Sequence, residues 1–138
     1  MAWCPRCGTS LSEHEMSSSY HEVEHTALFV KLPVKGKDFK LVAWTTTPWT
    51  LSANVALAVN PDFDYVKVNF QGDNIVLGKD RLKILKEDLE ILEEFKGSDL
   101  VGLEYETCFP EFKEQQFAHK IVAWDMVDSA EGSCVVHI

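Results

Sequence analysis

Hydroxyl side chains are concentrated in one short stretch, WTTTPWTLSAN, at residues 44–54. Thr45, Thr46 and Thr47 run directly into a proline, and Trp49 follows. A hydroxyl both donates and accepts hydrogen bonds, so a row of them suits a polar ligand such as a ribose or an ester. An indole next to them offers a flat face for a base. Threonine is also a good strand former, so the stretch predicts either the end of a strand or one wall of a polar pocket.

Other side chains that could do chemistry are scattered along the chain. His137 lies in an apolar segment, where a single histidine is usually a core residue with its ring nitrogens satisfied. Asn54 is of a type that more often caps a turn than binds a ligand. Nothing marks Cys134 as a nucleophile, and a small buried thiol is the simpler interpretation. Asp125 and Asp128 form either a carboxylate pair or turn caps, of which turn capping is the simpler.

A metal site is indicated at the start of the chain, where WCPRCG contains Cys4 and Cys7. This spacing is typical of one half of a zinc ribbon. A closed structural zinc site needs four ligands, and no second Cys-x-x-Cys follows. His14 or a second chain is one source of further ligands, and a partner knuckle outside this sequence is the simpler one. We therefore expect Cys4 and Cys7 to hold structural zinc only with ligands from outside this chain.

The elements that must position these side chains are mostly strands. β-Branched and aromatic residues, or alternating polarity, mark eight segments as extended. These segments are residues 25–34, 39–47, 54–59, 64–70, 75–78, 89–95, 119–125 and 133–138. Pro48 should end the second of them, because proline cannot donate to a sheet ladder. The sequence QGDN, residues 71–74, predicts a hairpin turn.

One helical pattern interrupts the strands. Asp80 is a suitable N-cap, and Leu82, Leu85 and Leu89 follow at helical spacing. Residues 97–105 read as a short turn or a second helix. Many short strands with one or two short helices predict a mainly β fold with some α (α+β), a curved or closed β-barrel rather than a doubly wound sheet.

Composition narrows the class of protein. At 138 residues, with 46% hydrophobic and 25% charged residues, the chain has the size and make-up of one soluble globular domain. No apolar run approaches about 18 residues, and the N-terminus has no signal core, so we expect a cytoplasmic location and no membrane partner. The net charge of −9 argues against generic binding to nucleic acid. Any nucleic-acid contact should therefore be local, at a pocket.

WTTTPWTLSANVALAV, followed about eighty residues later by GSCVVHI, resembles the editing domain of isoleucyl-tRNA synthetases. That family has a segment like WTTTPWTLPAN, whereas its valyl and leucyl relatives carry arginine where Thr47 stands. WCPRCGTSLSEHE is similar to the family's first zinc knuckle, so the resemblance spans nearly the whole chain. It implies a zinc-knuckle half and linker at residues 1–20 and an editing domain at residues 21–138.

What the resemblance implies is hydrolysis of valine misattached to isoleucine tRNA, and of misactivated valyl-adenylate, in a size-selective pocket. The implied partners are the 3′ end of that tRNA carrying valine, valyl-adenylate, and the rest of the parent synthetase. Such a reaction needs a positioned water and groups that stabilise the developing oxyanion. It requires no cofactor and no nucleophilic side chain.

The resemblance also assigns residues to the pocket. The positions that match the family's motif are Thr45, Thr46, Thr47, Trp49, Asn54 and His137. The three threonines would line the pocket and hold the ester and the terminal ribose, and the tryptophan would form a wall. The asparagine matches a polar position at the edge. The histidine matches one that bounds the substrate side chain and helps to exclude isoleucine.

Three departures from the family pattern qualify this expectation. Ser52 replaces the usual proline, and Ser133-Cys134 stands where Thr-Gly is common, so the added side chain should crowd the backbone of the pocket. The family's APAFG segment and the acidic residue that binds the substrate ammonium would follow Ile138. We therefore expect a fragment truncated on its C-terminal side, which folds but deacylates weakly or not at all. A non-catalytic β-barrel that binds aminoacyl-adenosine or a tRNA 3′ end is the alternative, and a zinc-ribbon interaction domain is a third.

Overall fold

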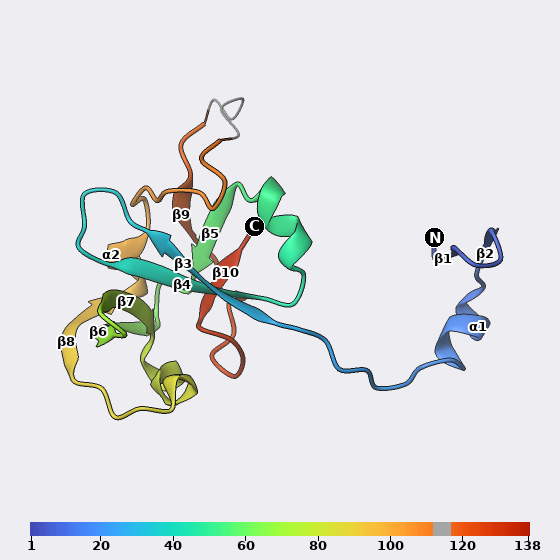
Figure 1. The fold of residues 1–138 in the computed structure, drawn as a ribbon, viewed down its shortest axis with the longest axis horizontal. Coiled ribbons are helices and arrows are strands. Elements are labelled where there is room, and N and C mark those ends of the chain that lie inside the picture. Colours follow the sequence, from blue (N-terminus) through green and yellow to red (C-terminus); the bar gives the residue numbers. More distant parts are fainter. Residues whose placement is uncertain (112–116) are drawn as a thin grey trace.

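The computed structural model describes residues 1–111 and 117–138. Short strands dominate, and the helices are brief (Figure 1). The strands are β1 (Trp3–Cys4), β2 (Thr9–Ser10), β3 (Leu28–Pro33), β4 (Lys40–Thr45), β5 (Ala56–Val59), β6 (Asp64–Phe70), β7 (Asp73–Gly78), β8 (Ile91–Lys96), β9 (Lys120–Ala123) and β10 (Val135–His137). The helices are α1 (Glu13–Ser17) and α2 (Gly97–Leu100), with 3-10 turns η1 (Pro48–Ala53) and η2 (Lys79–Leu85).

β4 is the strand at which the main sheet divides. One edge of β4 pairs with β3 in antiparallel fashion along its whole length. On the other edge, Lys40 and Leu41 pair in parallel with β7, whereas Trp44 pairs in parallel with β10. Two branches therefore leave the same edge, β7-β6-β8 from its first half and β10-β5-β9 from its second.

The segment between α2 and β9 closes one branch of the sheet. Ile121 N donates to Leu103 O at 2.9 Å, and Tyr105 N donates to His119 O at 3.1 Å. Glu106 N in turn donates to Pro33 O at 2.8 Å, next to an isolated bridge from Val34 to Tyr105. The outer strand β9 is thereby linked back to β3, and the sheet curls round its core. The expected mainly β, curved fold with short helices is confirmed.

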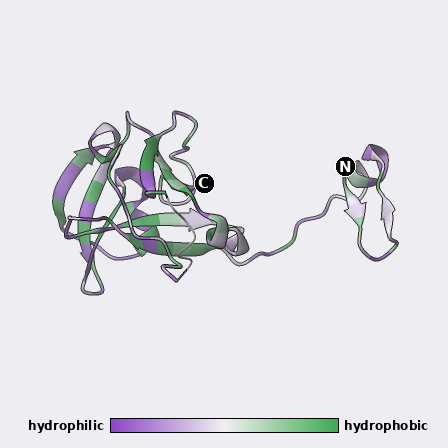
Figure 2. Ribbon diagram, turned by 90° about the horizontal axis from the view of Figure 1, so that it is seen from above, coloured by the Kyte–Doolittle hydropathy of each residue, from purple (hydrophilic) through white to green (hydrophobic). Residues whose placement is uncertain are grey.

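Two clusters of buried side chains fill the fold. The larger includes residues of both branches, whereas the smaller is made by β4, β6 and β7 and is covered by η2. The larger includes Leu32, Leu41, Leu57, Tyr65, Tyr105, Ile121 and Val135, and the smaller includes Val42, Val66, Val68, Ile75 and Leu77. Figure 2 shows hydrophobic residues concentrated along these strands. Each fully buried aliphatic side chain stabilises the fold by about 1.5–3 kcal/mol.

The hairpin between β6 and β7 has the tight turn that its sequence predicts. Gln71 and Gly72 form the two-residue loop, with φ of 55° and 86°. Positive φ at both positions matches the right-handed twist of the flanking strands. The turn is confirmed, although only two of the four QGDN residues lie outside the strands.

The helix predicted from Asp80 is wrong in type and length. Residues 79–85 form a 3-10 turn after Gly78, and Asp80 lies in its first turn rather than at its N-cap. Lys86 adopts a left-handed conformation with φ 56° and ends the turn. Leu89 lies beyond it and packs against the smaller cluster. Leu82 and Leu85 in this turn, and Leu89 in the loop after it, therefore pack against the sheet without forming one face of an α-helix.

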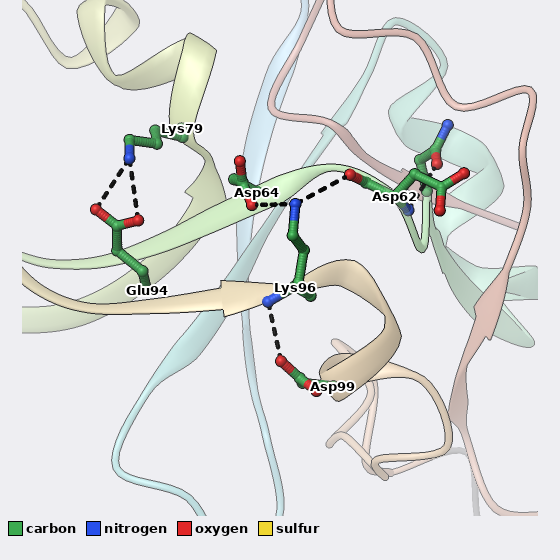
Figure 3. Close-up of polar contacts among 7 residues, drawn as sticks. Asp62, Asp64, Lys79, Glu94, Lys96 and Asp99 are labelled. Carbon is green, nitrogen blue, oxygen red and sulfur yellow. Dashed lines mark hydrogen bonds and ion pairs between the residues drawn. The ribbon is translucent and has the colours of Figure 1, made fainter.

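Ion pairs line the outer branch of the sheet (Figure 3). Lys96 Nζ lies 2.6 Å from Asp64 Oδ1, joining β8 to β6. Lys79 Nζ lies 3.0 Å from Glu94 Oε1, joining η2 to β8. These groups are largely solvated, so they contribute little stability. Charged side chains on the last strand of this branch do discourage pairing with another sheet edge.

The N-terminal part has its own local structure. β1 and β2 form a small hairpin, and α1 begins with a capping box in which Ser12 and Glu15 bond reciprocally. Residues 18–27 contain no helix or strand and lead into β3 (Figure 1). None of residues 1–27 is buried, and the division at residue 20 stays a prediction. Within the described residues, no helix combines the length and apolar character needed to cross a membrane.

Candidate active site

The threonine stretch lies where β4 ends and η1 begins. Thr45 is the last residue of β4 and is buried, with 5% of its surface exposed. The chain turns at once, and Thr47 N donates to Thr45 Oγ1 at 3.0 Å. Pro48 then starts η1, a position that suits proline because its φ is preset and its missing N–H is not needed there. The interpretation as a strand end is confirmed. The interpretation as one wall of a polar pocket stays a prediction.

His137 reaches these hydroxyls from the far end of the chain. β10 runs parallel to β4, with Val136 opposite Trp44, so the residues that follow each of these are neighbours. His137 Nε2 lies 3.0 Å from Thr45 Oγ1 and 3.3 Å from Thr50 Oγ1. Sheet pairing thus brings together two segments 92 residues apart in the sequence.

The hydroxyls contact one another as well as the imidazole. Thr45 Oγ1 lies 3.4 Å from Thr47 Oγ1, which lies 3.2 Å from Thr50 Oγ1. Thr50 Oγ1 donates to the Thr47 carbonyl at 2.7 Å. We call Thr45, Thr47, Thr50 and His137 the hydroxyl cluster. The cluster joins a buried strand end to an exposed turn. Its polar groups at the surface are therefore held in place by hydrogen bonds to the buried Thr45.

At neutral pH the imidazole of the hydroxyl cluster is mainly uncharged. Burial lowers the pKa of His137 below its ordinary value, because the surroundings disfavour the charged ring. Within the described part of the chain, its Nδ1 atom is buried without a hydrogen-bond partner. A neutral ring next to hydroxyls can orient a bound polar group, and it presents no fixed positive charge.

Three of the expected pocket residues lie outside the hydroxyl cluster, and two of these are exposed. Thr46 is exposed, and Trp49 has 70% of its surface exposed. The carbonyl of Trp49 accepts a hydrogen bond from Ser52 Oγ at 3.2 Å, inside η1. Their expected contacts with a ligand therefore stay predictions, with both side chains accessible.

Asn54 is the centre of a second, buried set of hydrogen bonds. Its Nδ2 donates to Ala56 O at 2.8 Å and to Ile138 O at 3.0 Å, and its Oδ1 accepts from the Tyr105 hydroxyl. His119 Nε2 lies 3.0 Å from the Asn54 carbonyl. These bonds tie the end of η1 to β5, to the end of β10 and to the closing segment. The structure thus shows Asn54 holding the backbone beneath the cluster, and its contact with a ligand stays a prediction.

Sequence reasoning missed three residues of this region. Thr50 belongs to the same motif, and its position three residues after Thr47 in a turn that starts with proline was an available signal. Tyr105 and His119 carry no such signal, because their contacts with Asn54 depend on how the sheet closes.

The loop before β10 is fixed from η2. Arg81 Nε donates to Gly132 O at 2.8 Å, and Arg81 Nη1 donates to Ala130 O at 2.7 Å. Gly132 has φ of +61° and lies against the ring of Trp44, where a side chain would collide. Asp128 Oδ1 accepts from Ala130 N at 2.8 Å, so Asp128 caps a turn as its simpler interpretation predicts.

Cys134 also belongs to this loop and is buried. Burial raises the pKa of its thiol to about 11, so the sulfur is protonated and a poor nucleophile. Its φ of +62° is unusual for a residue other than glycine. The side chain packs against Gly78, where an added Cβ would collide with the sulfur. The interpretation of Cys134 as a small buried thiol is confirmed, and the side chain takes up space beside β7.

Cys4 and Cys7 lie at the β1-β2 hairpin, and Cys7 N lies 3.4 Å from Cys4 Sγ. The pKa of the Cys4 thiol is lowered by hydrogen bonds from the backbone N–H of Cys7, then from the Cys7 side chain, then from the backbone N–H of Arg6. A lower pKa favours the thiolate that zinc binds. No group of three or more histidine, cysteine or acidic residues is placed to hold a metal ion within the described residues. These two cysteines fit a zinc half-site, and the source of further ligands stays a prediction.

Comparison with known proteins places this arrangement in a family. No family model matches the chain. The isoleucine–tRNA ligase of Clostridium acetobutylicum is 45% identical over 137 residues, which is 99% of this chain and 13% of that protein. The isoleucine–tRNA ligase of Picrophilus torridus is 42% identical over 136 residues, with 98% and 13% covered. This chain belongs to the isoleucine–tRNA ligase family. It spans about 13% of the length of these ligases.

Solved structures agree on the fold of this isoleucine–tRNA ligase segment. The crystal structure of GlLeuRS-CP1 matches with a TM-score of 0.68 at 15% identity, over 81% of this chain and 52% of that one. The editing domain of the P. knowlesi cytosolic leucyl-tRNA synthetase matches with a TM-score of 0.66 at 16% identity, over 80% and 57%. At these identities the likeness shows the fold, which is that of synthetase editing domains. The resemblance seen in the sequence is confirmed at the level of family and fold.

Proposed function

We propose that this chain is the editing domain of an isoleucine–tRNA ligase and that it hydrolyses valine misattached to isoleucine tRNA. The observation that carries the proposal is the contact between Thr45 Oγ1 and His137 Nε2. Residues from the two motifs of the family, far apart in the sequence, form one hydroxyl cluster where β4 and β10 end. Misactivated valyl-adenylate carries the same aminoacyl group, so it is the second proposed substrate.

The need for such a site follows from the energetics of the synthetic reaction. One methylene in an apolar pocket changes binding by about 1–3 kcal/mol, and isoleucine against valine is the standard worked case of that limit. A second pocket that admits valine and excludes isoleucine supplies the missing discrimination by size. The half-buried ring of His137, fixed by Thr45, is a rigid boundary for that exclusion.

The groups present suit ester hydrolysis by a positioned water. Thr46 and Thr47 expose hydroxyls and backbone groups that can hold the ester and the terminal ribose. Trp49 is exposed next to them and can stack on the terminal adenine. With a net charge of −9, the chain cannot supply the electrostatic attraction for a whole tRNA. We therefore assign that part of tRNA binding to the rest of the parent synthetase.

The test combines binding with turnover. A non-hydrolysable valyl-adenosine analogue is titrated into the 138-residue chain, and deacylation of valylated isoleucine tRNA is followed separately. We expect the analogue to bind and Thr47→Arg to abolish binding, because a long cation then occupies the site. Ser52→Ala, in the same turn, is the matched control and should bind as the wild type does.

Each outcome has a distinct meaning. Binding with turnover supports editing, and loss of both in Thr47→Arg assigns them to this site. Because the family's acidic residue is expected after Ile138, binding without turnover by this chain is decided with the full-length ligase. Turnover there supports editing, and binding without turnover there supports the alternative, a binding module for aminoacyl-adenosine or the tRNA 3′ end. No binding by the folded wild-type chain would overturn the proposal.

A further inference from the structure

The hydrogen of the Thr50 hydroxyl has a fixed direction. Thr50 Oγ1 lies 2.7 Å from the Thr47 carbonyl, which can only accept, so the hydroxyl hydrogen points to that oxygen. Thr50 Oγ1 therefore turns a lone pair toward His137 Nε2, which lies 3.3 Å away. A lone pair at this distance is favourable only if Nε2 carries a hydrogen.

The other ring nitrogen leads to the same assignment. His137 Nδ1 is buried and has no partner within the described residues. A hydrogen placed there would be an orphaned buried donor, and such donors are rarer in proteins than under-satisfied acceptors. A bare Nδ1 and a protonated Nε2 satisfy both constraints, and they describe a neutral ring.

This tautomer sets the direction of the remaining hydrogen bonds. Nε2–H is shared between Thr45 Oγ1 at 3.0 Å and Thr50 Oγ1. Thr45 Oγ1 already accepts from Thr47 N, so its own hydrogen turns to Thr47 Oγ1, and that of Thr47 turns to Thr50 Oγ1. Every hydroxyl hydrogen in the cluster is then used internally. Both lone pairs of Thr45 Oγ1 and of Thr50 Oγ1 are also occupied, so the hydroxyls offer a bound group the remaining lone pair of Thr47 Oγ1.

We infer that Thr50 is a positioning residue, which holds His137 as the neutral Nε2–H tautomer and so makes the hydroxyl cluster a hydrogen-bond acceptor. The group recognised there is a donor, such as a ribose hydroxyl or the attacking water. Thr50 acts through His137 and the other threonines rather than on the reacting atoms. The biological meaning of this inference rests on the proposed editing function, whereas the tautomer can be measured without it.

The test is nitrogen NMR of the imidazole in ¹⁵N-labelled chain, above the pKa of His137, where the protonated and bare ring nitrogens are distinguished directly. We expect wild type to show Nε2–H as the major form. Thr50→Val keeps the shape of the side chain and removes Oγ1, the oxygen that must accept from Nε2–H. Without it, the Thr45 hydroxyl can donate to a bare Nε2. The ratio of Nε2–H to Nδ1–H should fall by about threefold to tenfold, the size of one lost hydrogen bond. Thr50→Ser restores the hydroxyl and should restore the ratio.

The outcomes separate this inference from the proposed function. A wild-type ring in the Nδ1–H form, or an unchanged ratio in folded Thr50→Val, would overturn the role of Thr50, whatever the editing assay shows. If Thr50→Val does not fold, Thr50→Ala removes the same oxygen and is judged by the same ratio. A wild-type Nε2–H ring in a chain that neither binds the analogue nor deacylates tRNA would leave the tautomer in place and remove the editing function.

Discussion

At the scale of single residues, Thr45 is where the two distant segments meet. Its Oγ1 atom contacts His137 Nε2, the Thr47 amide and the Thr47 hydroxyl. The side chain is almost wholly buried, so each of these bonds is shielded from water. If this oxygen is removed, its polar partners lose a hydrogen bond, and water cannot easily reach them to replace it.

We expect Thr45→Val to lower the free energy of unfolding by about 1–3 kcal/mol, because buried partners lose their acceptor. Thr46→Val is the matched control, since the neighbouring side chain is exposed and should change stability by less than about 0.5 kcal/mol. Urea unfolding of both variants measures the difference. Equal stability of the two would show that the hydrogen bonds of the Thr45 hydroxyl contribute nothing.

The neutral ring of His137 predicts a pH dependence of stability. Burial lowers the pKa in the folded state below about 6.5, the value in an unfolded chain. Between these two values the unfolded chain binds more protons, so the free energy of unfolding falls as the pH falls below about 6.5 toward the folded-state pKa. His137→Gln should lose this component, and unfolding experiments between about pH 7.5 and 5 measure it. Identical pH profiles for wild type and variant would contradict the assignment.

At the scale of elements, the strands were predictable because their signals are local. The alternation in residues 64–70 identifies β6 to the residue, and the turn after it is specified by two residues. The region after Asp80 was not predictable from spacing, since a left-handed Lys86 and packing onto the sheet decided its form. The closure through residues 103–106 depends on contacts between distant segments, which no local pattern encodes.

The same distinction applies to the hydroxyl cluster. The residue types and the turn after Thr45 can be inferred from WTTTPWTLSAN, but the partnership with His137 required the family resemblance. Parallel pairing of β4 with β10 creates that partnership. From the residues alone, His137 was simply a histidine in an apolar strand.

Asp73 allows a test of how three strands are held together. Its carboxylate, at the start of β7, lies 2.9 Å from Lys31 Nζ on β3 and 2.8 Å from Lys40 Nζ on β4. Hydrogen bonds from these ammonium groups, Lys31 first, lower the pKa of Asp73 to about 2. The stabilisation is therefore complete above about 3.9, the unfolded pKa, and is lost as the pH falls through about 2.

We expect Asp73→Asn to be less stable than wild type at neutral pH, with a difference that shrinks as the pH falls below about 3.9. Chemical unfolding at several pH values measures this difference. Asp99→Asn, which removes an exposed carboxylate from the cap of α2, should not show the same interaction with Lys31→Met in a double-mutant cycle. Additive effects of Asp73→Asn and Lys31→Met would contradict direct pairing.

At the scale of the whole molecule, the chain has a sheet with a core and an N-terminal part without one. The buried hydrophobic residues lie between Leu32 and Val135. The capping box of α1 and the β1-β2 hairpin are stabilised by their own hydrogen bonds. The stability of the sheet should therefore depend little on the first residues of the chain.

Removal of residues 1–20 tests the predicted division of the chain. We expect the free energy of unfolding of residues 21–138 to match that of the full chain within about 0.5 kcal/mol, because no buried contact is removed. Binding of the valyl-adenosine analogue should also be retained. A loss of more than about 1 kcal/mol would show that the knuckle half packs on the sheet.

The parallel pairing of β4 with β10 also has a consequence for synthesis on the ribosome. Thr45 and His137 are 92 residues apart, and translation proceeds at about 5–20 residues per second. His137 is therefore synthesised roughly 5–18 s after Thr45. For all of that time the second half of one edge of β4 has no strand to pair with. A nascent chain thus exposes the motif long before the hydroxyl cluster exists, and the cluster is completed only after β10 has been synthesised.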